Sequence, residues 1–177
     1  MTMMSVSERC TAVATFRHVS VWLMETAARW TPITAEMEAK VMFGHHIWDF
    51  AQMADILGKR TFELRRHEHY TVPPSTAYQA FLAEVAGTAT VADRISALYD
   101  GVLPGLIARY RVYVAATDAI LDEPTIVLAE RIVLTLERQR AEAAALMAEL
   151  GLASDIGATF AAREATVGPI VAQDMAA

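Results

Sequence analysis

The chain has 177 residues, 54% of them hydrophobic and 20% charged, which suits one folded domain with a sizeable core rather than a disordered chain. Its net charge of −6 opposes binding to nucleic acid or to anionic lipid, and no run of lysine or arginine offsets that charge. The single cysteine, Cys10, cannot form an internal disulfide, so we expect a small buried side chain and a reducing compartment. No leader pattern and no apolar run of about 20 residues is present. We therefore predict a cytoplasmic protein that binds neither membranes nor nucleic acid.

Helix-forming residues dominate, and glycine and proline fall at a few points that divide the chain into long segments. This pattern predicts an all-α fold. Ser7, Thr34 and Asp122 are the predicted N-caps of the first, second and fourth long helices. The predicted long helices span about 8–30, 35–66, 90–121 and 122–150, with a short helix at about 76–85.

The connection between the second and third long helices, about 67–90, is too long for a tight hairpin and contains Pro73, Pro74 and Gly87. A hairpin, one long crossover and a second hairpin is the connectivity of a ferritin-like four-helix bundle. We expect one domain over residues 1–177, with the bundle at about 8–150. At 151–177 we expect a short helix plus a tail that packs on a partner. Gly101 and Gly105 predict an interruption of the third helix.

Helical periodicity predicts which side chains face the interior. His46 lies on the inward stripe of the second helix, with Asp49 at the margin of that stripe, and Gln139 is the polar exception on the fourth helix. The inward residues that could line an apolar cavity between helices are Met42, Phe43, Phe50, Met53, Tyr110, Thr117, Leu136 and Gln139. Leu121 is also expected to face inward.

Two segments, GHHIWDFAQMAD at 44–55 and DEPT at 122–125, resemble parts of bacterial ferritin-like proteins of the di-iron carboxylate superfamily. With the helix order, the resemblance covers about residues 9–150. It implies a bundle in which two helices each give a Glu and the other two each give a Glu-x-x-His pair to two iron ions. Here the core-facing pairs are Phe50 with Met53 and Leu136 with Gln139, which cannot supply the oxygen ligands that iron needs. The resemblance therefore predicts a degenerate di-iron site.

The first functional hypothesis is a bundle without an intact di-iron site, whose apolar cavity holds a small, largely apolar molecule. His46 and Asp49 supply the polar chemistry, as a general acid and base pair in an apolar pocket. Such a protein is a metal-independent tailoring enzyme or a carrier, with no cofactor. The competing interpretation of His46 is a core histidine that fixes the register of the helices.

The second hypothesis keeps a metal. Glu25, His46, Asp49 and Asp118 would bind iron or manganese in an atypical oxidase or oxygenase, which requires the four side chains to converge on one ion. His67 and His69 resemble a metal clip, but the neighbouring charges favour a solvated linker.

The third hypothesis is a dimeric structural or interaction module. The first helix carries a second, partly apolar side formed by His18, Val21, Glu25 and Ala28. This side and the C-terminal tail are the expected homodimer contact.

Overall fold

The computed structural model describes residues 4–64 and 70–171, and every regular element within them is helical, which confirms the all-α prediction. His67 and His69, which resemble a metal clip but were predicted to belong to a solvated linker, lie outside the described residues. No helix in these ranges has the length and hydropathy of a membrane span. The elements are α1 (Val6–Trp30), η1 (Thr31–Ile33), α2 (Met37–Glu63), α3 (Thr76–Ala86), α4 (Val91–Ile95), η3 (Ser96–Val102), α5 (Leu103–Ala116), α6 (Glu123–Glu149) and α7 (Ile156–Thr166).

Local chemistry sets where the helices begin. Ser5, rather than the predicted Ser7, caps α1: its hydroxyl accepts the Glu8 amide proton and the Glu8 carboxylate accepts from the Ser5 amide. Thr34 does not cap α2, because its hydroxyl donates to the Trp30 carbonyl. Asp122 stands at the predicted N-cap position of α6, yet its carboxylate binds side chains instead of the helix amides.

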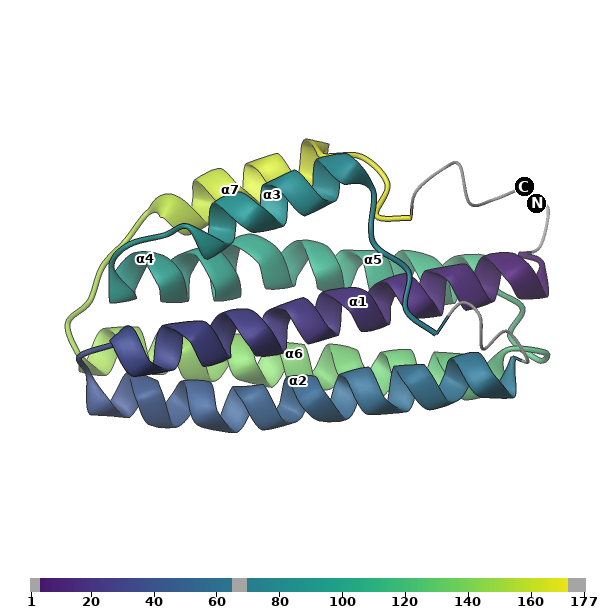
Figure 1. The fold of residues 1–177 in the computed structure, drawn as a ribbon, viewed down its shortest axis with the longest axis horizontal. Helices are drawn as coiled ribbons and strands as arrows, with labels where there is room; N and C mark the ends of the chain where they lie inside the picture. Colours follow the sequence, from purple (N-terminus) through teal and green to yellow (C-terminus); the bar gives the residue numbers. More distant parts are fainter. Residues whose placement is uncertain (1–3, 65–69, 172–177) are drawn as a thin grey trace.

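Four long helical segments lie side by side: α1, α2, α6 and the continuous run of α4, η3 and α5 (Figure 1). Their directions follow from contacts between the helices. His46, early in α2, meets Tyr99 in η3 and Glu142 late in α6, whereas Arg60, late in α2, meets Asp122 beside the start of α6. The α4–α5 run is thus parallel to α2, and α6 is antiparallel to both.

The chain between α2 and α4 returns along α1. The Val72 amide donates to the Ala14 carbonyl in the first half of α1, and the Trp30 indole donates to the carbonyl of Ala86 at the end of α3. α3 therefore carries the chain back along α1, so that α4 starts at the same end of the fold as α2. α3 and α7 lie together on the outer side of α5 (Figure 1), with the rings of Phe81 and Phe160 6.1 Å apart.

The two glycines that predicted an interruption of the third helix serve a different purpose. The helical run continues through Gly101 and Gly105, and α7 packs alongside it there (Figure 1). A Cβ on Gly101 would lie 2.6 Å from the Phe160 Cβ, and one on Gly105 would lie 1.9 Å from the Glu164 carboxylate. The missing side chains thus permit close approach of two helices. The predicted interruption takes the form of the π-helical segment η3, which contains Gly101 and replaces α-helix up to Val102, without a break in the helical run.

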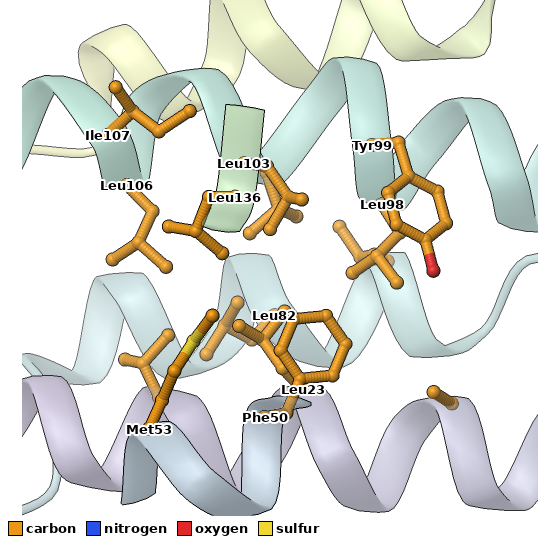
Figure 2. Close-up of a cluster of buried hydrophobic side chains, with 14 of the residues drawn as sticks. Leu23, Phe50, Met53, Leu82, Leu98, Tyr99, Leu103, Leu106, Ile107 and Leu136 are labelled. Atoms are coloured by element: carbon orange, nitrogen blue, oxygen red, sulfur yellow. The ribbon is translucent and has the colours of Figure 1, made fainter. Parts of the chain in front are cut away.

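The apolar core lies between the long helices. Leu23, Phe50, Met53, Leu106 and Leu136 point toward one another there (Figure 2), and each is at most 4% exposed. Most of the predicted inward stripes are confirmed. Leu121 is the exception at 72% exposed, because α5 ends at Ala116 and leaves Leu121 in the turn before α6.

A buried polar cluster joins the C-terminal ends of α2 and α5 to the beginning of α6. The Asp122 carboxylate, fully buried, accepts from the Tyr113 hydroxyl, the Arg60 guanidinium, Thr117 and Thr125. Burial raises the pKa of Asp122, but these hydrogen bonds outweigh it and hold the pKa below its usual value. The carboxylate remains charged and fixes this end of the fold.

We expect Gly101→Ala to destabilise the protein by about 1–3 kcal/mol, because the new methyl group forces α7 away from η3. Gly44→Ala is the matched control. Its site in α2 has no atom within 4 Å of the added methyl group, so it should gain about 0.5–1 kcal/mol from helix propensity. Urea unfolding measures both, and a Gly101→Ala protein as stable as wild type contradicts the close approach.

Candidate functional site

A buried histidine lies at the centre of the polar contacts between α2, η3 and α6. His46 is 0% exposed, and both of its ring nitrogens have partners. Nδ1 lies 2.6 Å from the Tyr99 hydroxyl, and Nε2 lies 2.8 Å from Oε2 of Glu142. His46 therefore joins three helical elements through two short hydrogen bonds.

The protons on this chain of hydrogen bonds can be assigned from the chemistry of the partners. An ionised carboxylate only accepts, so Nε2 of His46 carries the proton and donates to Glu142. Nδ1 is then the acceptor for the Tyr99 hydroxyl. Burial lowers the pKa of His46, and the Glu142 carboxylate opposes this only in part. The imidazole is thus neutral at pH 7.

The π-helical segment η3 presents Tyr99 to His46. Its wider turn closes a bond from the Leu103 amide to the Leu98 carbonyl, five residues back. The carbonyl of Tyr99 accepts instead from Nε of Arg140 at 2.9 Å. Burial raises the pKa of Tyr99 well above its ordinary value, so its hydroxyl keeps the proton that it donates.

Asp49 takes a different role from the predicted one. Within the described residues no hydrogen bond joins it to His46. Its Oδ2 accepts from Arg138 at 2.6 Å and from the Gln139 amide at 3.1 Å. Arg138 also donates to Oε1 of Glu142 at 2.7 Å. His46 and Asp49 thus belong to one network through Glu142 and Arg138, without forming an acid and base pair by themselves.

A groove of about 330 Å³ opens beside this network, between the first half of α2 and the last half of α6. Its lining combines apolar side chains with three glutamates. Glu142 is 43% exposed on its side-chain atoms, and Glu38 and Glu149 form no ion pair within the described residues. The lining residues are Glu38, Val41, Met42, His45, His46, Glu142, Ala145, Leu146 and Glu149.

This geometry limits the chemistry of the groove. His46 is covered and both of its nitrogens are engaged, so a molecule in the groove reaches Glu142 before it reaches the imidazole. Hydrogen bonding to His46 and to Arg138 lowers the pKa of Glu142. Glu142 is therefore a fixed negative charge, and His46 and Arg138 orient it.

The residues predicted to line an internal cavity occupy different places. Phe43, Phe50, Leu136 and Gln139 are each 0% exposed and pack in the interior. Met42 borders the acidic groove, and Met53 borders a shallow hollow of about 110 Å³ with Asp49. The other two join different clusters: Tyr110 stacks on Phe16 at 4.1 Å, and Thr117 binds Asp122.

The four residues predicted to bind a metal do not form one cluster. Glu25 is exposed, in a groove with His18, Trp22 and Arg29 between α1 and α3. Asp118 accepts from the amides of Ile120 and Leu121 in the turn before α6. Across residues 4–64 and 70–171, no three His, Cys, Asp or Glu side chains are placed to hold one ion. Cys10 is buried, as predicted.

The sequence analysis missed Tyr99 and Glu142, the two direct partners of His46. Glu142 lies one turn beyond Arg138 and Gln139, beside the inward stripe, and nothing local distinguishes it from a solvated glutamate. Tyr99 lies just before the interruption that was predicted at Gly101. Its contact with His46 depends on the π-helical turn, for which the sequence gives no signal.

Comparison of the chain with protein-family models, with curated proteins and with solved structures finds no match.

We expect the pKa of His46 to lie below the ordinary imidazole value of 6.5. The unfolded chain then binds a proton at a higher pH than the folded one, so the contribution of His46 to stability falls as the pH drops below about 6.5. Glu142→Gln should lower the pKa further, because it removes the carboxylate that favours the imidazolium, and Asp49→Asn should lower it less. Imidazole NMR measures these shifts, and a pKa above 6.5 would be incompatible with the assigned protons.

Tyr99→Phe should cost about 1–3 kcal/mol, because it leaves Nδ1 of buried His46 without a donor. Tyr110→Phe is the matched control. Its buried hydroxyl lies near Ser20 but makes no well-formed hydrogen bond in the described part of the chain. Its loss should change stability by less than about 0.5 kcal/mol. Equal costs for the two variants, measured by urea unfolding, would argue against the hydrogen bond to His46.

Proposed function

We propose that this protein is a ferritin-like four-helix bundle that binds a small molecule instead of a di-iron centre. The directions of the helices support the bundle. α1 and α2 are joined by the short η1, α2 and the α4–α5 run are parallel, and α6 is antiparallel to both. One long connection, containing α3, separates the two pairs, as in ferritin-like folds.

The composition of the interior supports the loss of the iron centre. Di-iron sites in such bundles are built from carboxylates and histidines that project inward from facing helices. Here Phe50, Met53 and Leu136 meet at the centre (Figure 2). These side chains offer no oxygen ligands for a hard, highly charged metal pair.

The acidic groove beside His46 is the binding site that the geometry supports best. Val41, Met42 and Leu146 give it apolar lining, while Glu38, Glu142 and Glu149 add three carboxylates. This combination suits a molecule with an apolar body and a protonated amine. The observation that carries the proposal is Glu142, which is held in the groove as a fixed anion by His46 and Arg138.

The same geometry favours binding over catalysis. A general base must reach the proton that it removes, and the nitrogens of His46 are covered and already bonded. His46 is therefore a positioning residue for Glu142. A carrier or sensor of an organic cation fits these properties better than a tailoring enzyme does.

Hexylammonium is a suitable probe, with hexan-1-ol and hexanoate as probes of equal chain length and different charge. In ¹H–¹⁵N NMR titrations we expect saturable shifts at Val41, Met42, Ala145 and Leu146 with hexylammonium. The alcohol should bind more weakly and the carboxylate most weakly, and added salt should reduce the difference. The reason is that three carboxylates line the groove.

The double variant Glu38→Gln with Glu149→Gln should weaken hexylammonium binding by about two- to tenfold. Glu123→Gln, at the opposite end of α6, is the control for the loss of a carboxylate outside the groove and should leave binding unchanged. Shifts outside the groove, or equal binding of the three probes, would refute the proposed ligand class. Elemental analysis of the purified protein gives a separate test, because iron or manganese at one equivalent or more contradicts the loss of the metal centre.

A further inference from the structure

The groove beside His46 has carboxylates at two levels along the helices that form it. At one level, Glu142 lies 2.8 Å from Nε2 of His46. Glu149 follows on the same face of α6, two turns later and about 10.5 Å further along the axis. Glu38 precedes His46 in α2 by about 12 Å along that axis. Because α2 and α6 are antiparallel, both displacements run in the same direction, and Glu38 and Glu149 share the second level.

The stretch of the groove between these two levels is apolar. Val41 and Met42 line it from α2, and Ala145 and Leu146 line it from α6. Each pair lies three and four residues beyond a glutamate of its own helix, and therefore on the same helix face as that glutamate. The groove thus has a carboxylate level at each end of an apolar middle.

The two levels differ in how their charge is balanced. Glu142 already accepts hydrogen bonds from His46 and, at 2.7 Å, from Arg138. Glu38 and Glu149 form no ion pair with any described residue. Glu149 is also the last residue of α6, whose last turn contains no basic residue. Carbonyl groups at a helix C-terminus carry partial negative charge, so this position disfavours a carboxylate and favours a cation beside it.

A single metal ion does not match this arrangement. In the two described ranges, no three His, Cys, Asp or Glu side chains are placed to hold one ion. The two carboxylate levels are about 10.5 Å apart along α6, whereas a calcium ion needs its oxygen ligands within about 2.6 Å. Two separate cationic groups joined by an apolar chain complement the groove instead.

We propose that the ligand of this groove is an aliphatic diamine, with one ammonium group at Glu142 and the other between Glu38 and Glu149. The inference rests on the proposed function and narrows its ligand class. An extended chain advances about 1.2 Å per bond, so the nitrogens of hexane-1,6-diammonium are about 8.4 Å apart. With a hydrogen bond of about 2.8 Å at each end, this ion connects carboxylate oxygens about 14 Å apart. That reach spans both levels, including a Glu142 carboxylate turned back toward Arg138.

Hexane-1,6-diammonium and hexylammonium have the same chain length and test the second charge. In ¹H–¹⁵N NMR titrations at constant ionic strength, the dissociation constant of the diammonium ion should be about fivefold lower or more, because its second contact is intramolecular. Its saturable shifts should include the amides of Glu38 and Glu149 together with that of Glu142.

The ratio of the two dissociation constants in one protein isolates the second contact. Glu38→Gln with Glu149→Gln should bring this ratio to about two, the statistical value for a ligand with two equivalent ends. Glu142→Gln should do the same, since each variant leaves one charged level. Glu123→Gln lies outside the groove and should keep the wild-type ratio. Circular dichroism checks that each variant is folded.

Three results would count against the proposals, and they are distinguishable. If neither amine shifts the groove amides, the proposed function fails and the diamine inference fails with it. If hexylammonium binds in the groove and the diammonium ion binds no more than twofold tighter, the diamine inference alone is overturned. If the wild-type ratio persists in the Glu38→Gln, Glu149→Gln protein, the second ammonium group does not lie at those carboxylates, which also overturns the inference.

Discussion

A buried imidazole must have hydrogen-bond partners for both ring nitrogens, and much of this structure is arranged around that requirement. Tyr99 approaches His46 from η3, and Glu142 approaches it from α6. These contacts fix the register of three helical elements at one level of the fold. The buried Asp122 cluster fixes the other end in the same way, so the apolar interior between them has a defined alignment.

The outer layer, formed by α3 and α7, depends on a different constraint, which is the distance between helix backbones. α7 approaches η3 and α5 closely because Gly101 and Gly105 have no side chains. Close packing along this contact accompanies the π-helical turn of η3, which presents Tyr99 inward. The short C-terminal helix thus supports the segment that supplies one of the two partners of His46.

The polar chemistry of the molecule is consequently found at the edges of the core rather than at its centre. Apolar side chains such as Phe50 and Leu136 fill the middle, where a ferritin-like bundle with a metal centre would need carboxylates. His46 connects the interior to the surface, because its Nε2 holds a carboxylate that faces the groove. The proposed binding site follows from this position.

The sequence by itself determined the helical class, the approximate extent of the long helices and most of their inward faces, because these follow from local propensity and from a period of 3.6 residues. It also indicated that His46 and Gln139 face the core. It could not identify Glu142 or Tyr99 as partners of His46, since they lie 96 and 53 residues away in the chain. Nor could it distinguish a glycine that interrupts a helix from one that admits a neighbouring helix. Only the tertiary structure decided these points, because hydrogen bonds between helices and close approaches of backbones depend on how distant segments pack.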